Sequence, residues 1–100
     1  MNRAVAMSDE ELLRQRRNFV RNMLADTELT ARQRDVAAFL VLGVSRDDVA
    51  LRLGIRPYTL QSHLVAIYNK FAIHNTAALS GIIIGRLVDR VVEQEEALGF

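Results

Sequence analysis

The chain has 100 residues and a formal net charge of +1, and half of its residues are hydrophobic, which suits one soluble globular domain with its own core. With so little net charge there is no general attraction to nucleic acid, so any basic DNA-binding surface must be local. The absence of cysteine excludes disulfides, thiolate metal sites and cysteine catalysis and fits the cytoplasm, while the longest apolar run, Ile82-Ile83-Ile84, is far too short to span a membrane.

Most of the sequence is typical of helices, and no stretch has the alternating pattern of a strand, so we expect an all-α fold. Ser8 followed by Glu11 is typical of a reciprocal capping box. The helix that begins there should run to about Leu24. Its apolar side consists of Leu12, Leu13, Phe19, Val20, Met23 and Leu24. Residues 1–28 are thus expected to be a tail and an amphipathic helix that packs on the last helix of the chain.

Residues 29–100 carry start and stop signals for four further helices. Thr30 with Gln33 forms a second capping-box pattern, glycines stand where two of the helices should end, and Pro57 suits a first helical turn. In chain order, the expected helices lie between Thr30 and Gly43, between Ser45 and Gly54, from Pro57 to about Phe71, and from Asn75 to about Ala97.

The short helix after Ser45, the turn Gly54-Ile55-Arg56 and the longer helix from Pro57 form a helix-turn-helix pattern. Glycine permits the sharp turn, and Ile55 can fill the gap between the two helices. This pattern alone is only moderately specific, because many all-α domains contain short pairs of helices. The expected fold is an all-α helix-turn-helix core with an added N-terminal helix.

In their order and spacing, residues 29–79 resemble the LuxR-type, or NarL/FixJ-type, helix-turn-helix domain. The matching positions are Leu29-Thr30, Arg32-Gln33, Gly43, Ser45, Asp48-Val49-Ala50, Leu53, Ile55, Thr59-Leu60-Gln61, His63, Ile67, Lys70-Phe71 and Ile73, with Gln33 where the family pattern has Glu. Region 4 of sigma factors is similar over the first half, but the segment from His63 to Lys70 fits the LuxR type better. The resemblance implies a bacterial, DNA-binding transcription regulator, usually dimeric and without a cofactor. Since only 28 residues precede Leu29, we expect a stand-alone domain over residues 29–100.

The helix of residues 57–71 is the expected recognition helix in the major groove of double-stranded DNA. Gln61 could bond adenine N6 and N7, Val65 could touch a thymine methyl group, and Ser62 could serve either base. Lys70 and Thr59 are the expected phosphate contacts. The full set of expected DNA-binding residues is Arg46, Arg56, Tyr58, Thr59, Gln61, Ser62, Val65, Asn69 and Lys70. The alternative is that these side chains form only a solvated face.

Three positions that are usually cationic in the family are neutral or acidic here. Gln61 replaces a Lys, Arg46-Asp47 replaces a frequent Asn-Lys, and Thr76 replaces a frequent Arg. Because each phosphate contact contributes about −0.9 to the salt slope of binding, such losses weaken binding at physiological salt. A second hypothesis is therefore a protein-interaction module that keeps the fold, binds DNA weakly, and acts by heterodimerisation or by docking on another regulator or RNA polymerase.

The last helix carries more apolar residues than one buried face requires. One stripe consists of Leu79, Ile83, Leu87 and Val91, and a second of Ile84, Val88 and Val92. One stripe can cover the domain, and the other then needs a partner. We expect homodimerisation at Ala77, Gly81, Ile84, Gly85, Val88 and Val92, with the two recognition helices about one DNA turn apart. The alternative is that both stripes are buried against the N-terminal helix.

Catalysis is not expected, because the sequence offers no nucleophile motif and no glycine-rich phosphate loop. His63 and His74 stand eleven residues apart with no cysteine nearby, which is a poor pattern for a metal site. The acidic pairs Asp47-Asp48 and Glu95-Glu96 are adjacent, so their side chains do not face one another on a helix.

Overall fold

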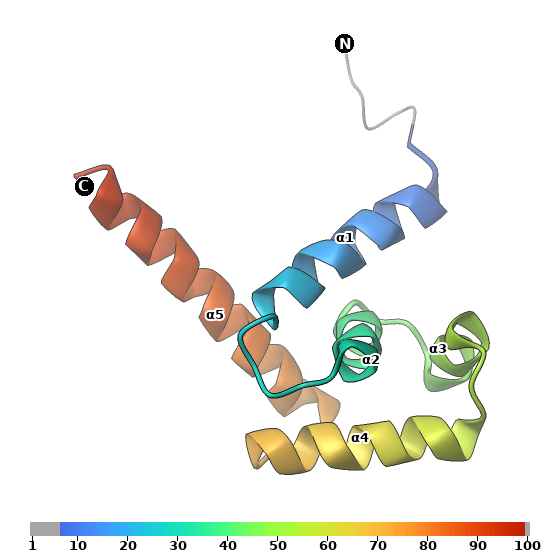
Figure 1. Cartoon of the computed structure of the whole chain (residues 1–100). Helices are drawn as coiled ribbons and strands as arrows, with labels where there is room; N and C mark the ends of the chain where they lie inside the picture. The colour runs from blue at the N-terminus through green and yellow to red at the C-terminus, as the bar shows by residue number, and fades with distance from the viewer. Residues whose placement is uncertain (1–6, 100) are drawn as a thin grey trace.

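The computed structural model describes residues 7–99, which form five α-helices and no strand (Figure 1). The helices are α1 (Asp9–Met23), α2 (Ala31–Val41), α3 (Arg46–Leu53), α4 (Pro57–Phe71) and α5 (Thr76–Ala97). The predicted all-α helix-turn-helix fold with an added N-terminal helix is confirmed. The first six residues of the segment 1–28, and Phe100, lie outside the described residues.

Side-chain caps begin the helices where the sequence predicts them. At α2 the capping box is complete, because the Thr30 hydroxyl accepts from the Gln33 N–H at 3.1 Å and the Gln33 amide oxygen accepts from the Thr30 N–H at 3.0 Å. At α1 the Ser8 hydroxyl accepts from the Glu11 N–H at 3.1 Å, but the exposed Glu11 carboxylate makes no return bond. The reciprocal box expected at Ser8 is thus only half formed, since its acidic partner stays in solvent.

The helix α2 is the centre of the fold and contacts each of the other four helices. Its residues from Val36 to Leu40 are all buried, so the second half of α2 lies inside the core. The core around it also contains Val20, Leu24, Leu29, Val49, Ala50, Leu60, Leu64, Ile67, Leu79 and Ile83. The inner face of α4 consists of the buried residues Leu60, Leu64 and Ile67, with Phe71 half-buried at its end.

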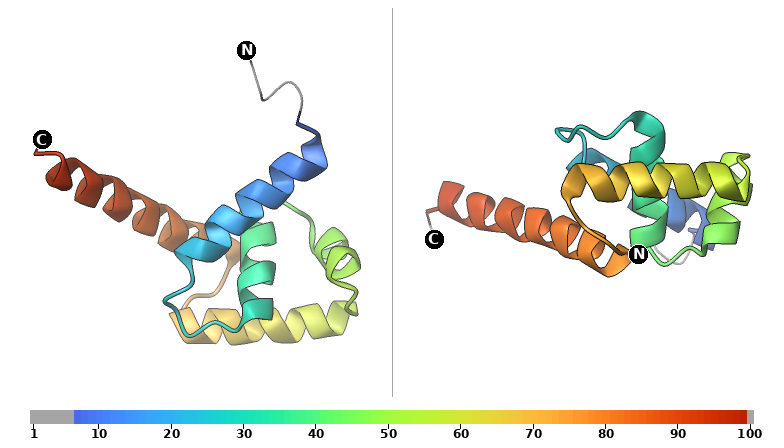
Figure 2. Two further views of the ribbon diagram at one scale, coloured as in Figure 1. Left: turned by 45° about the horizontal axis from the view of Figure 1, so that its top comes forward. Right: turned by 90° about the horizontal axis from the view of Figure 1, so that it is seen from below.

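The helix α1 lies across α2 and approaches α5 near its own C-terminal end (Figure 2). It buries Val20, Met23 and Leu24, but Phe19, which the sequence pattern places on the same apolar side, is 47% exposed. The reason is geometric: α2 covers the side of α1 that carries Val20 and Leu24, and α1 and α5 diverge beyond their crossing, as Figure 1 shows.

Only the first half of α5 belongs to the core. Leu79 and Ile83 are buried, and beyond them α5 projects away from the other helices (Figures 1 and 2). The stripe of Leu79, Ile83, Leu87 and Val91 therefore covers the domain only with its first two residues, while Leu87 and Val91 are exposed. The alternative in which both stripes are buried against the N-terminal helix is wrong, because α1 reaches α5 only near their crossing.

Within residues 7–99, no single helix is long and apolar enough to cross a bilayer. Taken together, α4 and α5 reach that length and composition, but a bend of 54° separates them.

Candidate nucleic-acid interface

The turn between α3 and α4 fixes the direction of α4. Gly54 has φ 64°, a left-handed conformation that suits glycine, and it ends α3. The Ile55 N–H then donates to the Ala50 carbonyl at 3.0 Å, and the Ile55 side chain packs half-buried against the core. With α4 also packed on α2, its outward direction is set by buried contacts from two helices.

We call the solvent-facing side of α4 its outer face; it consists of Tyr58, Gln61, Ser62, Val65 and Asn69. All five side chains are exposed, and the two largest apolar ones, Tyr58 and Val65, are 70% and 48% exposed. The view from below in Figure 2 shows α4 in front of the other helices. The structure thus brings these five predicted residues together on one uncovered surface about 16 Å long, since eleven steps of about 1.5 Å separate Tyr58 from Asn69.

Within the outer face, the Ser62 hydroxyl already has a partner for its proton. It donates to the Tyr58 carbonyl at 3.1 Å, one helical turn back. This internal bond leaves the oxygen lone pairs of Ser62 as acceptors. The amide groups of Gln61 and Asn69 make no hydrogen bond within the described chain and keep both donor and acceptor atoms available.

The N-terminal end of α4 presents a cation and free backbone donors. Arg56 is the exposed N-cap residue and makes no side-chain cap bond, so the N–H groups of Tyr58 and Thr59 in the first turn stay open. Thr59 is half-buried on the flank, and Arg46 is exposed at the start of α3. Such a helix terminus attracts anions, including phosphate.

Lys70 lies on the flank of α4 and points to the start of α2 rather than to the outer face. Its ammonium donates to the Glu28 carbonyl and to the Gln33 amide oxygen, each at 2.8 Å. Both acceptors are neutral, so the positive charge of Lys70 is not compensated by these bonds, and one ammonium proton remains free. Its assignment as a phosphate contact stays a prediction.

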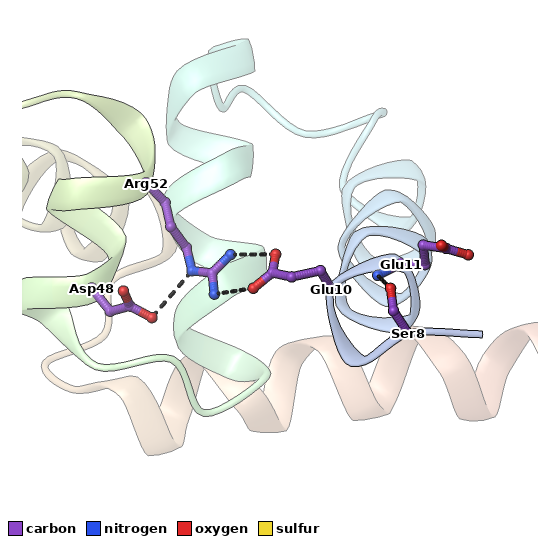
Figure 3. A network of polar contacts seen from close by, with 5 residues as sticks. All are labelled: Ser8, Glu10, Glu11, Asp48 and Arg52. Atoms are coloured by element: carbon purple, nitrogen blue, oxygen red, sulfur yellow. Dashed lines mark hydrogen bonds and ion pairs between the residues drawn. The ribbon is translucent and has the colours of Figure 1, made fainter. Parts of the chain in front are cut away.

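Arg52, another cation of the helix-turn-helix, is held by α1 (Figure 3). Its Nη2 and Nη1 donate to the two carboxylate oxygens of Glu10 at 2.7 and 3.0 Å, and its Nε donates to Asp48 at 3.1 Å. The hydrogen bond and charge of Arg52 hold the pKa of Glu10 below its ordinary value. The Arg52 guanidinium also lies 5.9 Å from the centre of the Phe39 ring, and the Arg17 guanidinium lies 5.6 Å from the same ring centre. The sequence patterns did not predict the pairing of Arg52 with Glu10, because 42 residues separate the two.

A second uncovered surface lies on α5; we call it the outer stripe, and it consists of Ile84, Leu87, Val88, Val91 and Val92. These side chains are 41–58% exposed. Next to them, the predicted dimer contacts Ala77, Gly81 and Gly85 are also exposed, and a side chain at either glycine would meet no atom within 4 Å. The glycines therefore do not serve a close helix approach among the described residues.

The side of α5 that faces α1 is polar instead. A groove of about 760 Å³ separates the two helices and is lined by Asn22, Met23, Ala25, Asp26, Gly81, Ile82, Gly85, Arg86, Asp89, Arg90 and Glu93. Arg86 bridges it by donating to Asp26 at 2.6 Å and to the Met23 carbonyl at 3.2 Å. The apolar outer stripe is thus turned away from the rest of the chain. Within residues 7–99, no group of three or more histidine, aspartate or glutamate side chains could hold a metal ion.

A comparison with protein families supplies an independent observation. The family model described as bacterial regulatory proteins, luxR family, matches residues 27–82, which span α2 to α4 and the first turns of α5. No curated protein and no solved structure matches the chain. The matched residues include the whole outer face of α4, while α1 and the outer stripe of α5 lie beyond them.

Proposed function

Since the chain belongs to the luxR family of bacterial regulatory proteins, a family of helix-turn-helix DNA-binding regulators, we propose that it controls transcription by binding a specific DNA sequence as a homodimer. The observation that carries this proposal is the outer face of α4. This face carries both polar and apolar side chains, and no other helix of the described chain covers it. It is about as long as five base-pair steps of about 3.4 Å. A helix of these dimensions fits the major groove, where base edges can be distinguished.

Phosphate contacts at both ends of the outer face would hold α4 in the groove. Arg56 and the open N–H groups of the first turn of α4 lie at one end of the outer face, and Lys70 lies at the other. Arg46 adds a third cation from α3. Three phosphate contacts per protomer correspond to a salt slope of about −5 for a dimer, at about −0.9 per contact.

The outer stripe of α5 supports self-association. Ala77, Gly81, Ile84, Val88 and Val91 follow one another at alternating steps of four and three residues, the spacing of a two-helix seam. The five aliphatic side chains of the outer stripe are half-exposed in one protomer. Completing the burial of each contributes about 1 kcal/mol, so about 10 kcal/mol for two protomers. That lies within the estimated 4–15 kcal/mol cost of association, so the burial of these side chains offsets much of the cost of forming a dimer.

The same stripe is the observation that favours the second candidate, a protein-interaction module. A different helical protein would also cover it, and the outer face of α4 carries no charge to strengthen DNA binding. In that case the chain acts through heterodimerisation, or by docking on another regulator or RNA polymerase.

Fluorescence anisotropy with genomic DNA fragments, titrated from low to physiological salt, tests the DNA proposal. We expect one set of fragments to be preferred near physiological salt. The matched variants are Arg56→Ala, which should lower the salt slope and weaken all sequences alike, and Gln61→Ala, which should weaken only the preferred ones. Binding only at low salt with no preferred fragment would favour the interaction module.

Sedimentation equilibrium at tens of micromolar tests the homodimer. Val88→Asp places a carboxylate in the middle of the outer stripe and should give a monomer, because an unpaired charge would be buried. Ala97→Asp adds the same charge to α5 away from the stripe and should leave the dimer intact. A monomeric parent chain at this concentration would contradict self-association.

A further inference from the structure

The outer face of α4 has no charged side chain among its five residues. Lys70, the cation of α4, is directed to Gln33 and the Glu28 carbonyl by two bonds of 2.8 Å. Arg56 precedes the helix at its N-cap, beside the open N–H groups that suit a phosphate. The chemistry of the outer face therefore consists of two amides, two hydroxyls and an exposed valine.

These groups match one class of base pair better than the other. Arginine and lysine are the side chains that pair with guanine O6 and N7, whereas an amide pairs with adenine N6 and N7, and an apolar side chain suits the thymine methyl group. A C·G pair beneath Val65 would bring a cytosine amino group against a valine and leave that donor without a partner. The Ser62 oxygen, whose proton is used by the Tyr58 carbonyl, accepts a hydrogen bond, which the amino group of adenine or of cytosine can donate, so Ser62 fits an A·T pair without selecting it.

The spacing of the two most specific side chains sets the register. Gln61 and Val65 stand four residues apart on the same exposed side of α4, which is about 6 Å along the helix axis. Two base-pair steps along B-DNA cover about the same distance, at about 3.4 Å each.

We propose that the core of each half-site is A·T, with an adenine read by Gln61 and a thymine read by Val65 about two base steps away. The inference rests on the proposed function and names the bases that the same surface takes.

Selection of binding sites from a random duplex pool gives the first test, and A·T pairs should dominate the centre of each selected half-site. The selected site is then synthesised with uracil for the candidate thymine, which removes only the methyl group, or with 7-deazaadenine for the candidate adenine, which removes only the N7 acceptor. For the parent protein we expect each change to weaken binding at least about fivefold, the lower end for one good base contact.

Two variants of the full chain make the assignment specific. Val65→Ala should bind the thymine and uracil duplexes equally but still distinguish adenine from 7-deazaadenine. Gln61→Ala should show the reverse pattern, so each variant is the matched control of the other. Both residues are exposed, and the midpoints of thermal unfolding should stay close to that of the parent chain.

Different failures point to different conclusions. Selection of half-sites centred on G·C pairs would overturn this inference and leave the proposed function standing. Equal sensitivity of both variants to both base analogues would also overturn it, because Gln61 and Val65 would then not touch those groups. If no sequence is enriched from the pool at any salt concentration, the proposed function fails and the A·T reading fails with it.

Discussion

Replacing Gln33 with Glu should stabilise the fold and weaken DNA binding at the same time. The Gln33 amide oxygen accepts hydrogen bonds from the Thr30 N–H and from Lys70, and the residue is 8% exposed. A carboxylate in the same position would make both bonds charge-assisted at the N-terminus of α2.

The magnitude follows from these two bonds. A hydrogen bond to a charged group contributes about 1.5–3 kcal/mol, against about 0.5–1.5 kcal/mol for a neutral one, and burying the carboxylate removes part of the gain. We expect the free energy of unfolding to rise by about 1 kcal/mol, which raises the melting temperature by roughly 4–8 °C for a chain of this size. Neutralising Lys70 should make the salt slope of DNA binding shallower by about 0.9 per protomer.

Lys70→Ala separates the two effects. It should give the same change in salt slope as Gln33→Glu, but it should lower stability, because Gln33 and the Glu28 carbonyl lose a donor. Thermal unfolding and anisotropy titrations at several salt concentrations measure both quantities. An unchanged salt slope in both variants would refute the reasoning, because Lys70 would then contact no phosphate.

Three further substitutions test local features of the structure. Glu10→Gln removes the carboxylate that holds Arg52. Because the pKa of Glu10 is lowered in the folded state, its contribution to stability is present above its ordinary pKa and disappears as pH falls through the lowered value. The melting temperatures of the parent chain and the variant should therefore converge in acid. Gly54→Ala meets no atom within 4 Å but forces alanine to φ 64°, and it should lower the free energy of unfolding by about 1 kcal/mol. Ala72→Gly should instead raise it by about 0.5–1 kcal/mol, since Ala72 already has φ 54° at the end of α4; equal effects of the two glycine exchanges would contradict the strain argument.

Local signals made the helix boundaries predictable. The Thr30 capping box, the left-handed Gly54 and the proline at the start of α4 each act within a few residues, so the sequence pattern contains the whole interaction. The outer face of α4 was predictable for the same reason. Once Leu60, Leu64 and Ile67 define the inner face, helical periodicity determines which residues point outward.

Contacts between distant segments were not predictable from such patterns. Periodicity identifies an apolar stripe but not the helix that covers it, so the pattern did not show that Phe19 and Leu87, each part of such a stripe, are exposed. The pairing of Arg52 with Glu10 and the turn of Lys70 to Gln33 each join residues more than thirty positions apart. A cation near a recognition helix therefore cannot be counted as a DNA contact from the sequence alone.

These distant contacts also bear on the division of the chain at residue 28, which followed the limit of the family resemblance. Glu10 of α1 pairs with Arg52 of α3 at 2.7 Å, and Arg21 of α1 pairs with Asp35 of α2 at 2.9 Å. Asp26, just after α1, pairs with Arg86 of α5 at 2.6 Å. Such partly exposed ion pairs contribute only about 0–1 kcal/mol each, so most of the α1 contribution must come from burying Val20, Met23 and Leu24, at about 1.5–3 kcal/mol each.

Together, the buried side chains and ion pairs of α1 contribute at least about 5 kcal/mol to the free energy of unfolding, which is comparable to the whole stability of many small domains. We therefore predict that residues 7–99 unfold in one transition and that a chain lacking residues 1–24 is largely unfolded at 25 °C. Circular dichroism of the shortened chain measures this directly. If α2 to α5 kept their helicity and melting temperature without α1, the segment before residue 29 would be a separate appendage. The folded core would then begin at residue 29, where the family resemblance begins.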